Sequence, residues 1–459
     1  MSTLVIRTVE TPDGSPVSFP NGIMIGTATG AGSINHIGTP GQQGFGVGIA
    51  PSLPTGFNKL YGTDDPASDN YGNYVYTDGS VMCYVPAFFY KYGTGANGFA
   101  LNVVDIQPFS AYASVSAANS AGYALHRAFY NAGTIRPGVM VDKYLCSNNS
   151  GVASSLKNGV VLSSAVRGGI ANTAFATLTG APANTFAGAI AAAKTRNLAA
   201  DSKFFCSSIF INKMLALLSL AHGSASTNTT YNAWYSSGST NFPKGNNNNA
   251  LGDAQDATIA YVWDGNATYA GCGKTGSANF FAKTAHNGQN CGVVDLNGLV
   301  SEISPGLTMD GATDAGKFYV LKTSADMGAV TGSNTLATDL WGATGLAALY
   351  DDLGVMSAFT GYALNFSDRA LTMGSASQVL SAATSGTAWQ MTAAGVPLVS
   401  GGSNQFGNDY LYDYSTADMC PHCGGSWSNS SSAGVWFSAF STSRASSSAT
   451  NGFRSALYL

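Results

Sequence analysis

Cys420 and Cys423 enclose a proline and a histidine, which is the spacing of half a zinc site. Cys272, Cys291 or His422 could supply further sulfur or imidazole ligands. The sequence contains no second closely spaced pair of the kind that usually completes a four-ligand site. We therefore predict free or locally oxidised thiols at this motif, with no bound metal and no cofactor.

Acidic residues offer two further kinds of chemistry. Asp295 and Glu302 could bind calcium, but the Glu-Pro-Asn and Trp-Asn-Asp motifs of calcium-dependent sugar-binding lectins are absent. Paired carboxylates can also cleave a glycosidic bond, and the sequence alone leaves that alternative open. No acidic pair stands out for this role, because Asp351 and Asp352 are expected at the solvated end of a helix.

Two glycine-rich stretches invite comparison with phosphate-binding loops. Residues 271–277 read GCGKTGS, but the full pattern needs a glycine where this chain has Thr268. Residues 25–33 read IGTATGAGS, and no helical pattern follows them. Neither stretch therefore predicts a nucleotide site.

Residues 424–459 suggest recognition rather than catalysis. Their ends carry glycines and the apolar residues Trp427 and Phe453, which we expect in the core. The middle mixes Ser, Thr, Asn and Ala with a few aromatic residues. In a paratope, rigid rings supply contact area and small polar side chains supply adaptable hydrogen bonds. A plain serine-rich loop followed by a last strand is the alternative interpretation.

Composition limits the class of protein. The chain has 459 residues, of which 10% are charged, and its formal net charge is −4. Soluble domains average roughly 25% charged residues. No block of Lys or Arg is present, which argues against a nucleic-acid partner. The longest strongly apolar run, residues 214–221, is too short to cross a bilayer, so we expect no membrane insertion.

The first residues, MSTLVIRTVETPDG, carry charges where a secretion signal needs an apolar core. We therefore expect synthesis in a cytoplasm, where thiols stay reduced. Residues 1–80 are rich in Gly and Pro with short apolar pieces, and we interpret them as a β-rich N-terminal module.

Regular elements are expected from residue 81 onwards. Residues 81–93 and 137–147 are β-branched and aromatic, as in strands. A helix over 184–196 should begin at Asn184 or Thr185. A second helix over 209–222 should begin after Ser208 and end at Gly223, with apolar residues at helical spacing.

The rest of the chain is loop-rich. Residues 291–304 predict two strands joined by a turn at Asn297-Gly298. Residues 307–420 form a long insertion that should contain a short helix over 339–353. His222 is expected at a helix end as a structural or solvated histidine.

Several phrases, taken in order, resemble the C-type-lectin-like fold in its formylglycine-generating-enzyme branch. The resemblance covers residues 81–459 and implies an α+β fold with two helices packed on small antiparallel sheets. The phrases are PGVMVDKY (137–144), KMLALLSLA (213–221), FPKGN (242–246), GVVDLNGLVSEI (292–303), GGSW (424–427), Arg444 and GFR (452–454).

The enzymes of that branch carry two cysteines after the Gly-Gly-Ser-Trp phrase, and this chain has none there. The related iron-dependent enzymes need a histidine cluster, and the five histidines of this chain form no such motif. A thiolate nucleophile or a ligated metal is required for either chemistry. We therefore expect a protein that is not an enzyme.

The C-terminal segment is more similar to that of phage receptor-binding proteins of the major-tropism-determinant type, which retroelements diversify. The resemblance implies a tail-fibre protein that attaches the virion to a host cell-surface receptor, glycan or protein. It assigns Trp427, Arg444, Phe453 and Arg454 to a rigid frame. The implied binding residues are Ser428, Ser430, Ser432, Trp436, Phe437, Ser438, Phe440, Ser441, Ser443, Ser446, Ser447 and Ser448.

In this interpretation Trp436, Phe437 and Phe440 would be exposed anchors. Residues 1–80 would dock to other tail proteins, and the fibre tip would be a homotrimer located in the virion. Three alternatives stay open: a bacterial surface adhesin of the same fold, a structural tail component without receptor contact, and an enzyme of the formylglycine-generating type.

Overall fold

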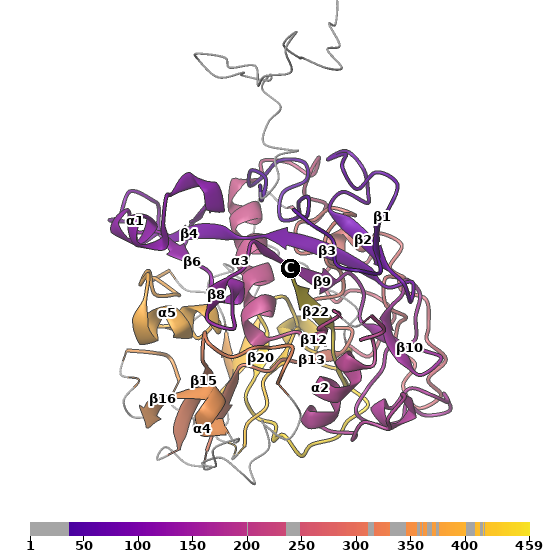
Figure 1. The fold of residues 1–459 in the computed structure, drawn as a ribbon. Helices are drawn as coiled ribbons and strands as arrows, with labels where there is room; N and C mark the ends of the chain where they lie inside the picture. Colours follow the sequence, from indigo (N-terminus) through magenta and orange to yellow (C-terminus); the bar gives the residue numbers. More distant parts are fainter. Residues whose placement is uncertain are drawn as a thin grey trace, which may run out of the picture.

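The computed structural model describes residues 36–199, 201–235, 248–310, 316–330, 346–355, 359, 361–364, 370–372, 376–400, 409–413, 416 and 418–459. The FPKGN phrase and residues 1–35 lie outside the described residues. The described chain is an α+β structure with few helices and several small sheets, which agrees with the α+β class that the resemblance implied (Figure 1).

An antiparallel sheet of six strands forms one layer of the molecule. The last strand of the chain lies inside this sheet, where Leu457 pairs with Met140 and Ala456 pairs with Phe205. The C-terminal segment is therefore anchored by pairing on both sides. In spatial order the strands are β1 (Phe57–Lys59), β2 (Asn73–Tyr76), β3 (Val81–Pro86), β9 (Gly138–Asp142), β22 (Ser455–Tyr458) and β12 (Phe205–Cys206).

The helix α3 (Ile209–Ala225) lies at the centre of the molecule (Figure 1). Ser208 caps it, because its hydroxyl accepts a hydrogen bond from the Ile211 amide at 3.3 Å. The residues from Ile209 to His222 are buried, so the helix is covered on every side rather than along one stripe. It continues through Gly223, and the predicted stop at that glycine is wrong.

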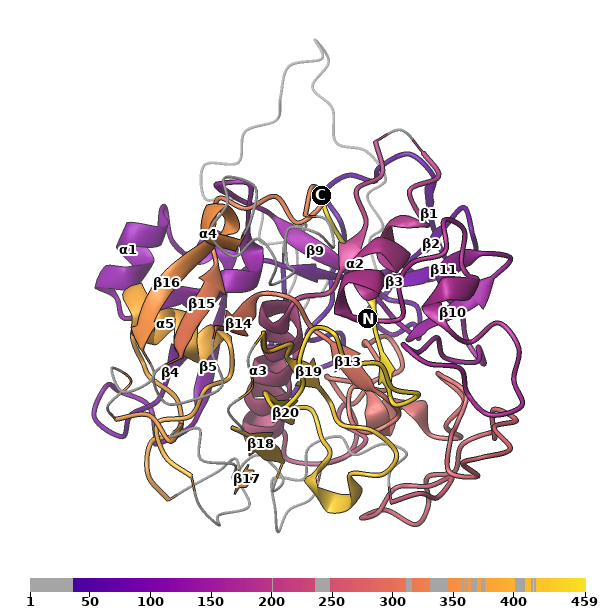
Figure 2. The same ribbon diagram turned by 90° about the horizontal axis from the view of Figure 1, so that it is seen from below.

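A second, mixed sheet lies next to α3, and the C-terminal segment contributes two of its strands, β20 and β21 (Figure 2). Its strands β18 and β20 are parallel, and β19 pairs antiparallel with both β20 and β13. Residues far apart in sequence therefore share one surface. In spatial order the strands are β17 (Ala370–Thr372), β18 (Tyr410–Tyr412), β20 (Ser438–Ala439), β19 (His422–Cys423), β13 (Ser301–Ile303) and β21 (Asn451–Gly452).

Smaller elements surround these two sheets. The predicted 184–196 helix is α2 (Phe186–Lys194), and Thr185 stands at its N-cap. In α5, the Trp389 indole donates to the Leu125 carbonyl at 3.0 Å and ties the insertion to β6. The remaining elements are β4 (Phe88–Tyr92), β5 (Val104–Pro108), α1 (Val115–Ser120), β6 (Ala124–Leu125), β7 (Tyr130–Asn131), β8 (Thr134–Ile135), β10 (Cys146–Asn149), β11 (Val152–Ser155), β14 (Leu307–Met309), β15 (Lys317–Leu321), α4 (Leu346–Leu349), β16 (Tyr350–Val355) and α5 (Gly386–Ala393).

Two predicted elements differ from the structure. Residues 291–304 contain the single strand β13, because the preceding residues bond to other segments, as when the Val294 amide donates to the Lys143 carbonyl. The helix expected over 339–353 is replaced in its described part by α4 and strand β16. Asp351 and Asp352 therefore lie in a strand, where Asp352 forms an ion pair with Lys317 at 2.8 Å.

The boundary expected at residue 80 falls within a hairpin. Strand β2 pairs with β3 across it, and Asn73 lies opposite Cys83. The amide of Asn73 also donates to the Cys291 carbonyl at 2.8 Å. Residues 36–80 are thus joined to the main sheet by main-chain pairing.

Candidate functional site

The C-terminal segment passes through both sheets, and the strands fix the ends of its loops. From β19 it forms the loop 424–437, returns through β20, forms the loop 440–450 and enters β21 and β22. Gly424 and Gly425 have positive φ values of 82° and 79°, which a side chain would strain. A Cβ on Gly424 would approach the Leu296 carbonyl oxygen to 2.7 Å. The Gly-Gly pair therefore lets this loop start against the 291–300 segment.

The four residues expected to form a rigid frame lie in the interior. Arg454 forms an ion pair with Glu302 at 2.9 Å and donates to the Lys143 carbonyl at 3.0 Å. Arg444 pairs with Asp418 at 2.9 Å. The frame thus ties the segment to β9, β13 and the residues before β19.

The three aromatic residues expected as exposed anchors are buried, and this expectation is corrected. Trp436, Phe437 and Phe440 are 1%, 2% and 0% exposed. The Lys213 ammonium group of α3 donates to the carbonyls of Trp436 and Phe437 at 3.0 and 2.9 Å. Asp409 accepts from the Trp436 amide at 2.8 Å. These contacts hold residues 436–437 in the interior, where burial of large aromatic rings lowers the free energy of the folded state.

The predicted serine positions divide by burial. Ser447 donates to the Ser164 carbonyl, and the Ser448 hydroxyl lies 2.7 Å from that of Thr450, so both support loop structure. The hydroxyls of Ser443 and Ser446 lie 3.2 Å apart. Ser428 and Ser447 are exposed, Ser430, Ser441, Ser443, Ser446 and Ser448 are half-buried, and Ser432 and Ser438 are buried.

A hollow of about 390 Å³ opens over the second sheet, between the two C-terminal loops. Three of the predicted residues line it: Ser428, Phe437 and Ser441. The other predicted residues lie in the core or elsewhere on the loops. The further lining residues are Ser301, Tyr412, His422, Ser426, Asn429, Ala439, Thr442, Thr450 and Asn451.

The hollow is polar and carries no Lys, Arg, Asp or Glu side chain among its lining residues. His422 lies in its floor, and burial lowers the pKa of this histidine to about 4, so the ring is neutral near pH 7. The buried Nε2 atom of His422 has no hydrogen-bond partner in the described part of the chain. Hydrogen bonding by neutral groups is therefore the chemistry that the hollow offers.

The rim and the aromatic part of the hollow are held in place. The Asn429 side chain accepts from the Ser426 amide at 2.7 Å, and the Ser426 hydroxyl lies 3.0 Å from that of Ser428. The rings of Tyr412 and Phe437 lie 5.6 Å apart at 60°. A ligand would meet a preformed site, which lowers the entropic cost of binding.

Sequence reasoning missed several lining residues. Tyr412 lies in the insertion, and Ser301 and Thr450 belong to strands or turns whose neighbours no local pattern reveals. The sequence indicates His422 only as a possible metal ligand. His422 stands two residues before Gly424 and Gly425, which begin the polar loop 424–437. That position is the one sequence signal that could have indicated a binding role for His422.

The groups considered for metal or thiol chemistry have structural roles. All seven cysteines are free and buried, and burial raises the pKa of the Cys420 and Cys423 thiols. Asp295 accepts from Thr275 and from the Gly276 amide, and Glu302 pairs with Arg454. Within the described ranges, no group of three His, Cys, Asp or Glu side chains is placed to hold a metal ion.

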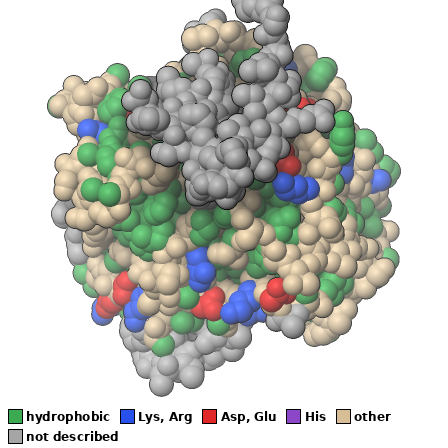
Figure 3. Space-filling view, turned by 45° about the horizontal axis from the view of Figure 1, so that its top comes forward, with side chains coloured by type: hydrophobic (Ala, Val, Ile, Leu, Met, Phe, Trp, Pro, Cys, Tyr) green, Lys and Arg blue, Asp and Glu red, His purple; other side chains and the backbone are tan. Residues whose placement is uncertain are grey.

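The described surface agrees with the low charge content of the sequence. On the face shown in Figure 3, Lys, Arg, Asp and Glu side chains are few and scattered, and neutral atoms dominate. None of the helices in the described part of the chain has the length and apolar character that crossing a membrane requires. No protein-family model matches this chain, and no curated protein matches it either.

Proposed function

We propose that this chain is a receptor-binding protein of a phage tail fibre, which attaches the virion to the host cell surface through the hollow of its C-terminal segment. The observation that carries the proposal is a neutral, polar hollow built from Ser, Thr and Asn on a rigid buried frame. Such a site can exchange small side chains on its loops without disturbing the core beneath. The aromatic rings act as its floor and support instead of exposed anchors.

We also propose the finer fold assignment, a C-type-lectin-like fold. Two helices, α2 and α3, and a last strand that pairs inside the main sheet support it. The frame residues Arg444 and Arg454, taken from the family phrases, are buried and ion-paired, as a structural role requires.

Residues 1–80 are proposed to dock to other tail proteins, and a homotrimer is proposed for the fibre tip in the virion. Three copies would multiply a weak affinity at each hollow through avidity. The hydrogen-bonding character of the hollow fits weak, reversible individual contacts.

The test is binding of the labelled full-length protein to intact candidate host cells. Ser441→Trp places a large ring at the hollow, whereas Ala445→Trp adds the same ring at an exposed position that does not line it. Both variants are first checked for unchanged melting temperature and assembly. We expect Ser441→Trp to reduce cell binding at least about tenfold, because a filled pocket excludes the ligand, and Ala445→Trp to bind as the wild type does.

Equal binding by both variants would reject the hollow as the receptor site. Binding by neither the wild type nor the variants to any host that the phage infects would favour a structural tail component. An adhesin would instead be found on the surface of the cell that produces it. Turnover of a cysteine-containing peptide would favour the enzyme alternative.

A further inference from the structure

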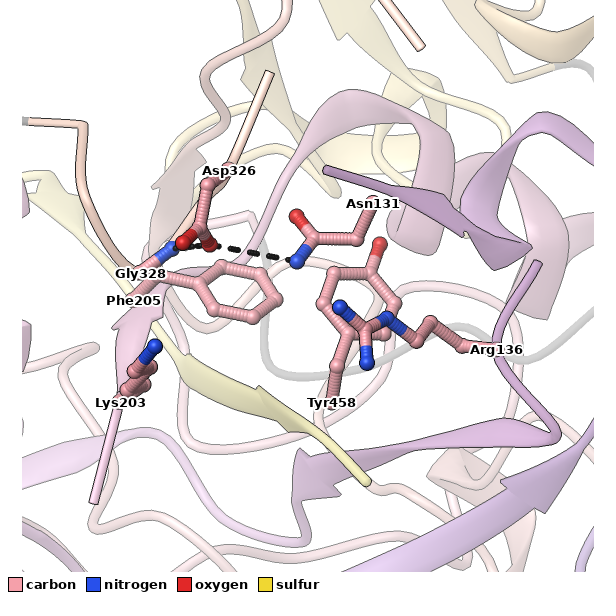
Figure 4. A pocket seen from close by; sticks show the side chains of 7 residues that line it. All are labelled: Asn131, Arg136, Lys203, Phe205, Asp326, Gly328 and Tyr458. Atoms are coloured by element: carbon pink, nitrogen blue, oxygen red, sulfur yellow. Dashed lines mark hydrogen bonds between the residues drawn. The ribbon is translucent and has the colours of Figure 1, made fainter. Parts of the chain in front are cut away.

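A second pocket, of about 110 Å³, shares no lining residue with the hollow (Figure 4). It is formed where the end of the β7–β8 hairpin, the approach to β12, the 326–328 turn and the end of β22 meet. Its lining residues are Asn131, Arg136, Lys203, Phe205, Asp326, Gly328 and Tyr458.

Two aromatic rings form the centre of this pocket, as Figure 4 shows. Phe205 and Tyr458 are stacked, with ring centroids 5.0 Å apart and an interplanar angle of 23°. The Tyr458 hydroxyl donates to the Ala128 carbonyl at 2.7 Å, which fixes the ring. The polar side chains of the pocket surround this pair of rings.

A fixed carboxylate occupies one side of the rings. Asp326 accepts from the Asn131 side chain at 3.2 Å and from the Gly328 amide at 3.0 Å, both through Oδ1. Asn131 is itself held, because it accepts from the Met327 amide at 2.8 Å. The chain passes close to Lys203 here, since a Cβ on Gly328 would lie 2.9 Å from the Lys203 Cβ. The second oxygen of a rigid carboxylate is a good acceptor for a ligand hydroxyl.

Two cationic side chains, Arg136 and Lys203, line the other sides. Neither forms an ion pair with a carboxylate in the described part of the chain. The buried Nε atom of Arg136 also has no hydrogen-bond partner there. The pocket therefore carries two cations against one carboxylate.

We propose that this pocket binds a small hydroxylated carboxylate. The ligand carboxylate would lie between Arg136 and Lys203, since charge-assisted bonds to guanidinium and ammonium groups are the strongest available here. A neighbouring hydroxyl would donate to Asp326, and the carbon skeleton would lie over the two rings. A free hydroxy acid and the carboxylate end of an acidic sugar share this chemistry.

The experiment is titration calorimetry on the full-length protein at low salt, with lactate, acetate, methyl glucuronide and methyl glucoside as probes. We expect lactate and methyl glucuronide to bind, acetate to bind at least about threefold more weakly than lactate, and methyl glucoside not to bind here. Arg136→Gln and Lys203→Gln should each weaken binding about tenfold or more, as loss of a charged hydrogen bond does. Lys59→Gln, which removes an exposed lysine elsewhere, is the matched control and should leave binding unchanged.

Asp326→Asn should abolish the preference for lactate over acetate, because the amide offers a ligand hydroxyl a weaker acceptor than the carboxylate does. Stronger binding of the glucuronide than of lactate identifies an acidic sugar as the ligand, and the reverse order identifies a free acid. Absence of binding by both carboxylates, or binding unaffected by Arg136→Gln and Lys203→Gln, overturns the proposal. Equal affinities for lactate and acetate overturn the role of the hydroxyl.

Discussion

Lys213, near the start of α3, donates a hydrogen bond from its ammonium group to the main-chain carbonyl of Trp436, at 3.0 Å. A second bond, to the carbonyl of Phe437, is 2.9 Å long. The lysine is fully buried, and burial lowers its pKa. Helix α3 thus holds the C-terminal segment by bonds to the main chain of that segment. These bonds do not depend on which side chains the loops carry.

Lys213→Met should destabilise this attachment. The variant keeps the length of the side chain but leaves two buried carbonyls without their donor, so we expect the free energy of unfolding to fall by about 2 kcal/mol. Urea denaturation measures the loss, and amide hydrogen exchange of residues 434–440 should accelerate. Lys59→Met, which removes an exposed ion pair, is the control and should change stability by less than about 1 kcal/mol. Unchanged exchange in Lys213→Met would contradict the role of the lysine.

Trp436→Ala should behave as a core substitution. The ring is 1% exposed, so its removal should cost about 3–5 kcal/mol in the free energy of unfolding. Trp263, which is 47% exposed, offers a matched comparison, and Trp263→Ala should cost less than about 1 kcal/mol. Thermal and urea unfolding of both variants decide the point, and similar small losses in the two would place the Trp436 ring at the surface.

Arg454→Met should unfold the chain more readily, because it leaves Glu302 buried without its partner. Removing one member of a buried pair typically costs about 3–5 kcal/mol. The double variant Arg454→Met with Glu302→Gln removes the stranded charge and should recover part of the loss. A double-mutant cycle by urea denaturation measures the coupling, and strictly additive losses would show that the two side chains act independently.

Buried histidines predict that acid destabilises the fold. Burial lowers the pKa of His126 to about 3 and that of His222, His286 and His422 to about 4, from 6.5. The unfolded chain takes up protons below about pH 6.5 while these native histidines stay neutral. The contribution of these histidines to the free energy of unfolding is therefore fully present above pH 6.5. It falls as the pH goes from 6.5 towards 4, by about 1.4 kcal/mol per pH unit for each histidine.

Asp295 and Glu302 act in the opposite direction, because burial raises their pKa values and the native state binds their protons first. Between pH 6.5 and 5, the four histidines take up protons in the unfolded chain. Their effect on the free energy of unfolding should exceed that of the two carboxyl groups in this range. Urea denaturation at pH 7.5 and pH 5.5 measures the difference, and His422→Gln should reduce the slope by one proton. A stability that is constant or rises on acidification would contradict this prediction.

Local sequence predicted the elements whose signals lie within a few residues. The cap at Ser208 and the apolar spacing of residues 211–221 indicated α3, and the β-branched run from Val81 indicated β3 and β4. Arg454, which the resemblance placed in the frame, is buried. These features depend on backbone propensity and on side-chain periodicity.

Contacts between distant segments decided the rest. Trp436 and Phe437 are held in the interior by Lys213, which donates to their carbonyls and lies more than two hundred residues earlier in the chain. No local sequence pattern predicts hydrogen bonds between residues so far apart. The hollow brings Tyr412 of β18 beside Phe437, because two short strands pair across the second sheet. The residue types determine which side chains favour burial or hydrogen bonding, and only the folded chain determines which of them meet. The free energy of burying a ring depends on the partners that surround it, and those partners come from the whole chain.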